Sequence, residues 1–153
     1  LGIAAERTLP KWRSDTFDRH VSRDAQVTVQ NCDVVLWADT FNNAYEPEHL
    51  RAALAVMQHM GVKVLLSGAA STEPLCCGRT SLSVGMIDDA KVHAKRTLDA
   101  LAPAIARGVP VVGLEPSCLL SMRDEWLGMG LGESAVALSK LAVLFEEWWI
   151  AQT

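Results

Sequence analysis

Three short apolar runs alternate with amphipathic stretches in this sequence, and the alternation restricts the chain to one class of fold. The runs are residues 33–38, 62–66 and 109–114. Nearly continuous apolar runs of this length predict strands that are buried on both faces of a sheet. Strands that alternate with helices favour right-handed crossovers and a parallel sheet. We therefore expect a single-domain α/β fold, a three-layer and Rossmann-like arrangement with a mostly parallel sheet and helices on both faces.

The stretches between and after these runs have helical periodicity. A helix is expected over residues 48–60, because Pro47 suits its first turn and Gly61 its end. A second helical pattern is expected to be kinked or divided at Pro103. The remaining patterns predict a helix after the third strand and an amphipathic helix near the end of the sequence. These three further helical patterns cover residues 82–107, 118–126 and 133–149.

The N-terminal part of the sequence differs from the rest. Residues 4–23 are polar and irregular, and the sequence starts at Leu1 without an initiator Met. We expect residues 1–31 to be a linker and residues 32–153 to be an α/β domain cut from a longer protein.

Charge and hydropathy exclude some classes of function. The 18 acidic and 14 basic residues are interspersed and give a net charge of -4, so nucleic acid is not an expected partner. No apolar stretch approaches the about 20 residues of a transmembrane segment, and the N-terminus lacks the pattern of a signal peptide. The four cysteines are too few for a secreted disulfide scaffold. We expect a cytoplasmic protein with reduced thiols.

Three cysteines follow predicted strands. Cys76 and Cys77 come after the second strand and precede Gly78, whereas Cys118 comes after the third. The carboxyl ends of parallel strands meet at one edge of a sheet, so these thiols should converge there. Gly78 is expected to adopt a left-handed conformation that lets a bulky inorganic group approach the backbone. We call this edge the carboxyl rim, which comprises residues 39–43, 67–79 and 115–118.

Convergent thiolates favour zinc or an iron–sulfur cluster over hard cations. Glu115 is a candidate oxygen ligand, and Asp39 is either a ligand, an outer partner of the site or a helix or turn cap. Arg79 either lowers the pKa of the neighbouring thiols or is a solvated loop residue. The alternative is that all three thiols are buried as small hydrophobic residues, the role that we also expect for Cys32.

The motifs around Cys76, Cys77 and Gly78, and around Cys118 in Glu-Pro-Ser-Cys, carry a family resemblance. The sequence resembles the cysteine-rich CCG domain that is found in heterodisulfide reductase and in the iron–sulfur subunits of glycolate oxidase and anaerobic glycerol-3-phosphate dehydrogenase. The family pattern is a Cys, then Cys-Cys-Gly, then Cys-x-x-Cys. The resemblance covers about residues 33–126.

Two cysteine positions of that pattern hold other residues in this chain. Thr40 stands at the first Cys, and Glu115 stands at the first Cys of Cys-x-x-Cys. With these substitutions the motifs Asp-Thr-Phe and Gly-Leu-Glu-Pro-Ser-Cys look most like those of one branch of the family, the FAD-linked oxidases of D-2-hydroxy acids. The resemblance implies FAD and 4Fe-4S clusters in other domains of the parent protein, namely an FAD domain and a ferredoxin-like domain. It also implies a candidate second CCG domain, and peripheral attachment at the inner face of the membrane through the parent complex.

On this resemblance the domain would assist electron transfer or hold a degenerate zinc or iron–sulfur site, with Cys76, Cys77, Cys118 and Glu115 as candidate ligands. It would do no substrate chemistry alone, because it contains no nucleotide-binding glycine motif. Two alternatives stay open: a metal-free docking module with vestigial thiols, and a thiol-disulfide redox enzyme with Cys76 or Cys77 as nucleophile.

Overall fold

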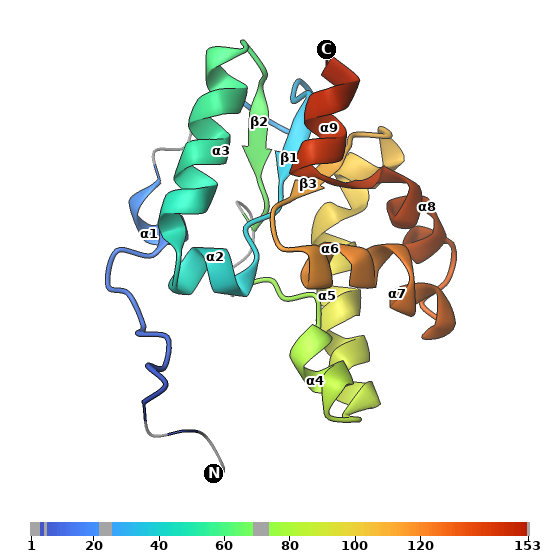
Figure 1. The fold of residues 1–153 in the computed structure, drawn as a ribbon. Helices are drawn as coiled ribbons and strands as arrows, with labels where there is room; N and C mark the ends of the chain where they lie inside the picture. Colours follow the sequence, from blue (N-terminus) through green and yellow to red (C-terminus); the bar gives the residue numbers. More distant parts are fainter. Residues whose placement is uncertain (1–3, 5, 22–25, 69–73, 153) are drawn as a thin grey trace.

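Four parallel strands form the centre of the structure, a computed structural model that describes residues 4, 6–21, 26–68 and 74–152 (Figure 1). The strands lie in the order β2-β1-β3-β4, and each neighbouring pair is parallel. The predicted parallel α/β fold is confirmed, and the three expected strands lie within the three apolar runs. The strands are β1 (Val34–Leu36), β2 (Val64–Leu66), β3 (Val111–Gly113) and β4 (Ala142–Leu144).

Helices of very different lengths connect the strands. The two longest are α3 (Pro47–His59), which joins β1 to β2, and α5 (Ile87–Ala106), which joins β2 to β3. The others are α1 (Phe17–His20), α2 (Thr40–Ala44), α4 (Arg79–Ser83), α6 (Pro116–Arg123), α7 (Glu125–Gly128), α8 (Glu133–Leu141) and α9 (Phe145–Gln152).

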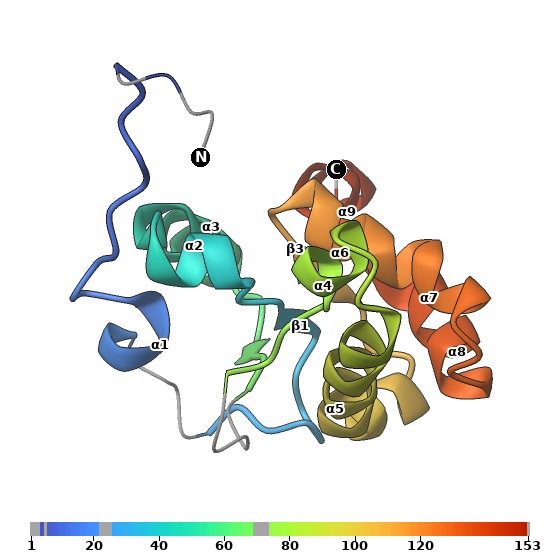
Figure 2. The same cartoon turned by 90° about the horizontal axis from the view of Figure 1, so that it is seen from below.

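Both faces of the sheet are covered, as near-continuous apolar strands require. Val34 and Leu36 point into one apolar cluster, which includes side chains of α1, α3 and α9. Val35 and Trp37 point into the other, which is built from α5, α6, α7 and α8. Figure 2 shows α1 and α3 on the opposite side of the sheet from α5 and α8. The expected three-layer arrangement follows from this alternation.

The fourth strand corrects the sequence interpretation of residues 133–149, for which a single helix is the wrong prediction. Helix α8 ends at Leu141, the next three residues pair with β3, and α9 begins at Phe145. The pairing gives β3 hydrogen-bond partners on its second side, which a continuous helix would leave unsatisfied. A tertiary contact therefore overrides the helical periodicity.

The division of residues 82–107 also differs from the expectation. The chain breaks at Gly85, which has a positive φ of 81°, between α4 and α5. Pro103 lies inside α5, and the helix continues through it to Ala106. Glycine rather than proline ends the first helix because its backbone reaches the left-handed region without a steric cost.

The N-terminal segment makes more contact with the domain than an irregular linker would. Phe17 in α1 is buried in the cluster that contains α3 and α9. Asp15 pairs with Arg13 and with Arg51 of α3. This segment therefore contributes to the core of the described structure. Its residues 1–3, 5 and 22–25 lie outside the described residues.

Helix length and composition bear on membrane insertion. In the part of the chain that the structure describes, no helix combines the length and the apolar character that crossing a membrane demands.

Candidate functional site

The strand order puts a topological switch point between β1 and β3. From β1 the chain crosses to β2 on one side, and from β2 it returns past β1 to β3 on the other side. Ligands of open parallel sheets bind at such points, beyond the carboxyl ends of the strands. The segments that follow β1 and β3 here are residues 39–43 and 115–118 of the carboxyl rim, which contain the N-caps and first turns of α2 and α6. Residues 69–73 of the same rim lie outside the described residues.

Asp39, the first residue of the loop after β1, caps a helix. Its fully buried carboxylate accepts hydrogen bonds from the backbone N–H groups of Phe41 and Asn42, at 3.0 and 2.9 Å, and from the side-chain amide of Asn42 at 2.7 Å. Burial raises the pKa of Asp39, an effect that the negative charge of Glu115 adds to and the hydrogen bonds from Asn42 oppose. Of the roles considered for Asp39, the cap is the one that these contacts support.

Glu115, at the matching position after β3, also caps a helix. Its Oε2 accepts hydrogen bonds from the backbone N–H of Cys118 at 2.6 Å and from the hydroxyl of Ser117 at 2.7 Å. Burial raises the pKa of Glu115, but these hydrogen bonds outweigh that effect and hold it below its usual value. The carboxylate of Glu115 is therefore engaged with the N-terminus of α6.

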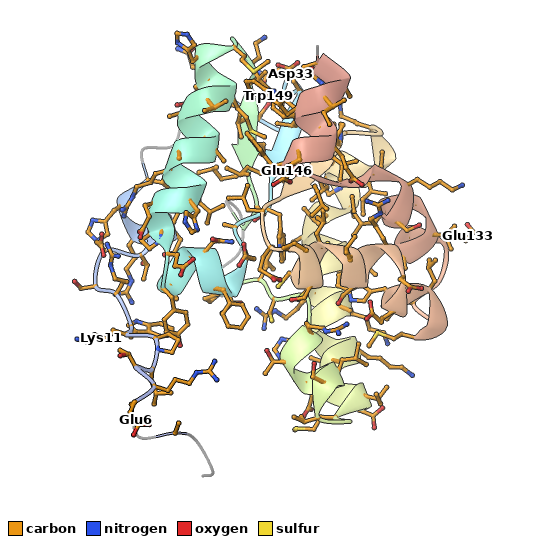
Figure 3. The ribbon with its side chains drawn as sticks, in the orientation of Figure 1. Glu6, Lys11, Asp33, Glu133, Glu146 and Trp149 are labelled. Carbon is orange, nitrogen blue, oxygen red and sulfur yellow. The ribbon has the colours of Figure 1, made fainter. Side chains whose placement is uncertain are left out.

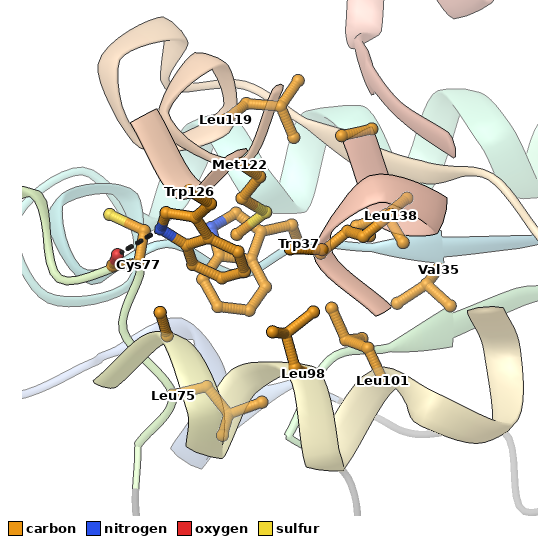
Figure 4. Close-up of a cluster of buried hydrophobic side chains, with 14 of the residues drawn as sticks. Val35, Trp37, Leu75, Cys77, Leu98, Leu101, Leu119, Met122, Trp126 and Leu138 are labelled. Carbon is orange, nitrogen blue, oxygen red and sulfur yellow. Dashed lines mark hydrogen bonds between the residues drawn. The ribbon is translucent and has the colours of Figure 1, made fainter. Parts of the chain in front are cut away.

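The loop after β2 carries Cys76 and Cys77, and neighbouring helices hold its backbone in place. The hydroxyl of Thr97 in α5 donates to the carbonyl of Cys76 at 2.9 Å, and the indole N–H of Trp126 in α7 donates to the carbonyl of Cys77 at 3.1 Å (Figure 4). Both donors are buried. The backbone that carries the two thiols is therefore held in place within an otherwise irregular segment.

Gly78 adopts the predicted left-handed conformation, with φ of 80°. Its close neighbour, however, is protein backbone: a Cβ at this position would lie 2.8 Å from the carbonyl oxygen of Ala90 in α5. In the described structure the missing side chain thus lets the cysteine loop pack against α5, whereas the expectation was approach of an inorganic group.

The three rim thiols lie close together. Cys76 and Cys77 are consecutive residues, and the thiol of Cys77 donates a hydrogen bond to Cys118 with the two sulfurs 3.1 Å apart. The pKa of Cys76 is raised by its interaction with Cys77 and lowered by that with Thr40. Glu115 accepts a hydrogen bond from the backbone N–H of Cys118. We call Cys76, Cys77 and Cys118 the row of thiols, with Thr40 beside one end and Glu115 beside the other.

This arrangement keeps the thiols of Cys76 and Cys77 protonated near neutral pH. The hydrogen bond that Cys77 donates to Cys118 is the main cause that raises the pKa of Cys77 to about 12, and burial adds to it. The hydrogen bond to Cys77 and burial likewise raise the pKa of Cys76. Backbone N–H groups of Gly78 and Arg79 donate to Cys76 and Cys77 at 3.4 and 3.5 Å and oppose these shifts only in part.

The guanidinium of Arg79 is directed at another group. It bonds to the carboxylate of Glu125 and, at 3.5 Å, to the hydroxyl of Ser121. The charge of this guanidinium is compensated by Glu125, and the pKa values of the neighbouring thiols are raised, so these contacts do not favour the alternative in which Arg79 lowers those values.

The donor set does not fit a metal ion as it stands. Two thiolates on one tetrahedral zinc are about 3.8 Å apart, because each zinc–sulfur bond is about 2.3 Å long; Cys77 and Cys118 are closer, at 3.1 Å. The carboxylates of Asp39 and Glu115 cap helices. Among the described residues, no three His, Cys, Asp or Glu side chains are grouped so that they could hold a metal ion. A zinc ion or cluster would need these side chains to rearrange.

The fourth cysteine lies apart from this row. Cys32 is buried, its thiol donates to the carbonyl of Val29 at 3.7 Å, and Arg107 contacts its sulfur at 3.9 Å. The expected packing role of Cys32 matches this placement. Asp33, the next residue, lies with Trp149 at the opposite, amino end of the sheet (Figure 3).

Sequence reasoning missed the two residues that anchor the cysteine loop. Thr97 is a polar residue on the buried side of α5, where Ala94 and Leu98 are also buried, and that position is the only signal in the sequence. For Trp126 the sequence leaves two roles open, contact with a neighbouring domain and an ordinary place in the core. It is fully buried and belongs to the core.

In comparisons with known proteins, no family model matches the chain, and neither a curated protein nor a solved structure shows significant similarity to it.

Proposed function

We propose that this chain is the cysteine-rich CCG-type domain of an FAD-linked iron–sulfur oxidoreductase that oxidises a D-2-hydroxy acid. The domain has an accessory role: it lies against the FAD and ferredoxin-like domains of the same polypeptide and assists electron transfer to an acceptor. One observation carries the proposal. Thr40 and Glu115, which replace two cysteines of the family pattern, lie at the two ends of the row of thiols formed by Cys76, Cys77 and Cys118.

The row joins residues from all three loops of the carboxyl rim. Thr40 follows β1, Cys76 and Cys77 follow β2, and Cys118 follows β3. The five positions of the sequence pattern thus lie together at a switch point, where ligands of parallel sheets bind. This grouping is expected if the domain descends from one that bound a ligand there. The present side chains do not fit a cluster without rearrangement, so no electron-transfer step is assigned to a metal in this domain.

A metal-free docking module is the second candidate, and exposed apolar side chains beside the rim favour it. Phe41 in α2 is 51% exposed and Leu120 in α6 is 40% exposed. Trp12, 69% exposed, packs edge-on against Tyr45, whose ring is 6.3 Å from that of Phe41. Exposed aromatic groups of this kind suit contact with another protein domain.

The raised pKa values disfavour the third alternative, a thiol-disulfide enzyme. Such an enzyme needs a thiolate at neutral pH as its nucleophile. The thiols of Cys76 and Cys77 have pKa values shifted in the opposite direction.

Anaerobic purification of the full-length polypeptide tests the proposal. We expect bound FAD, iron and acid-labile sulfide, and reduction of the flavin by a D-2-hydroxy acid. The variant Cys77→Ser should keep the rate of flavin reduction but lower electron delivery to an external dye severalfold, whereas Cys32→Ser should leave both unchanged. Absence of flavin, or no reduction by any D-2-hydroxy acid, would refute the assignment. A Cys77→Ser variant with normal electron delivery would favour the docking module.

A further inference from the structure

Cys77 and Cys118 are positioned to form a covalent bond. Their sulfurs are 3.1 Å apart, and a disulfide bond is about 2.05 Å long, so the sulfurs need to approach by only about 1 Å. The two residues belong to different segments, the loop after β2 and the first turns of α6, and are 41 positions apart in the sequence. Both cysteines are free thiols in this structure.

Solvent reaches the row of thiols only at one end. Cys77 and Cys118 are buried, with 2% and 4% of their surface exposed, whereas Cys76 is half-buried. A dissolved oxidant therefore meets Cys76 first. Cys76 is next to Cys77 in the chain, and the sulfur of Cys77 lies 3.1 Å from that of Cys118, so the accessible thiol adjoins the close pair in an order that suits successive exchange.

We propose that Cys77 and Cys118 are an oxidative modification site, in which a small organic disulfide converts the two thiols to a disulfide bond and Cys76 is the sulfur that it reaches first. The inference concerns only the thiols of this chain and does not depend on the class of the parent enzyme.

The exchange has three steps. The Cys76 thiolate attacks the small disulfide RSSR, forms a mixed disulfide and releases RS⁻, which takes up the proton from Cys76. The sulfur of Cys77 then attacks the sulfur of Cys76 and releases the second RS⁻, which takes up the proton from Cys77. Finally Cys118 attacks Cys77 and releases Cys76, which regains a proton as Cys118 loses its own. In sum, two thiols lose two electrons and two protons, and RSSR is reduced to two RSH.

The Cys77–Cys118 bond is the favoured end product for a geometric reason. A bond between the adjacent Cys76 and Cys77 departs from ordinary disulfide geometry and is correspondingly easy to reduce. A bond between Cys77 and Cys118 instead closes a long loop, which restricts the unfolded chain and stabilises the fold. Because Cys77 and Cys118 are buried and only Cys76 is accessible, the modification is slow and stoichiometric.

The reduced, chelator-treated protein should be incubated anaerobically with bis(2-hydroxyethyl) disulfide and then digested with trypsin without reduction. We expect peptide 64–79 to be linked to peptide 108–123 and the intact chain to lose the mass of two hydrogens. Fragmentation between residues 76 and 77 should place the link at Cys77. A link from Cys76 to Cys118, a persistent Cys76–Cys77 bond, or no link after complete oxidation of Cys76 would each overturn the inference.

Variants separate the roles of the three sulfurs. Cys76→Ser should slow formation of the link by about tenfold or more, and Cys118→Ser should halt oxidation before any link to peptide 108–123 forms. Cys32→Ser, a change at a buried cysteine outside the row, is the matched control and should keep the wild-type rate and link. Circular dichroism of each variant checks that it is folded. Linking of Cys76→Ser at the wild-type rate would overturn the assignment of Cys76 as the first sulfur attacked. If the unmodified parent enzyme contained no flavin or was not reduced by a D-2-hydroxy acid, and the Cys77–Cys118 link still formed, only the proposed function would be refuted.

Discussion

The three loops of the carboxyl rim are of two kinds. The loops after β1 and β3 begin their helices with a buried or half-buried carboxylate, Asp39 or Glu115, which accepts hydrogen bonds from backbone N–H groups. The loop after β2 begins α4 at Gly78, without a side-chain cap, and carries two thiols. The capping hydrogen bonds are sufficient to explain the position of each carboxylate. The thiols of the cysteine loop cap no helix, so the fold provides no comparable explanation for them. A carboxylate at a ligand position of a family pattern is therefore weaker support for a metal than a thiol is.

The largest expected effect concerns the cysteine loop. Gly78→Ala should lower the free energy of unfolding by about 3 kcal/mol, because the new Cβ meets the backbone of Ala90 at 2.8 Å and φ is 80°. Gly61→Ala is the matched control: Gly61 has φ of 78° but no atom within 4 Å of an added Cβ, so about 1 kcal/mol is expected. Urea denaturation measures both values. Equal losses of unfolding free energy for Gly78→Ala and Gly61→Ala would contradict the close packing of the cysteine loop on α5.

A smaller effect is expected at the cap of α2. Asp39→Ala should cost about 2 kcal/mol, because the N–H groups of Phe41 and Asn42 lose their acceptor. Asp39→Asn keeps one acceptor oxygen and should cost about half as much. The exposed Glu133→Ala, in a helix with no side-chain cap, should change stability by less than about 0.5 kcal/mol. Thermal or urea unfolding is the measurement. A loss for Asp39→Ala as small as that for Glu133→Ala would mean that the carboxylate is not needed as a cap.

The smallest effect is on thiol reactivity. Cys76 is faced by Thr40 and Cys77, and the pKa of its thiol is raised, so thiolate is scarce below pH 9. Alkylation of Cys76 by iodoacetamide at pH 7 should be about tenfold or more slower in the native chain than in urea. The native rate should keep increasing above pH 9, where the rate in urea levels off. Rapid labelling of Cys76 at pH 7, detected by peptide mass spectrometry, would contradict the raised pKa of this thiol and support a nucleophilic thiolate.

The sequence was sufficient for the parts that depend on local pattern. Apolar runs located β1, β2 and β3, and the parallel arrangement then placed Cys76, Cys77 and Cys118 at one edge. It was insufficient for β4, because Ala142, Val143 and Leu144 form a strand only through pairing with β3. Apolar runs this short fit a helix equally well.

The chemistry of the site was less predictable than its location. The raised pKa of Cys77 depends on the 3.1 Å contact with Cys118, which side-chain packing sets. The charge of Arg79 suggested the opposite shift, and only the tertiary structure shows that Glu125 binds this guanidinium. The hydrogen bond from Trp126 to the carbonyl of Cys77 is likewise visible only in the tertiary structure, because it joins residues 49 positions apart.

Restoring the missing cysteines tests most directly the claim that Thr40 and Glu115 occupy two ligand positions of a CCG-type site. The double variant Thr40→Cys and Glu115→Cys would be reconstituted anaerobically with iron and sulfide and compared with the wild type and with Gln58→Cys and Ser134→Cys, which add two exposed thiols elsewhere. We predict severalfold more iron and acid-labile sulfide per chain in the rim variant than in either reference protein. Equal iron and sulfide in all three proteins would contradict the claim.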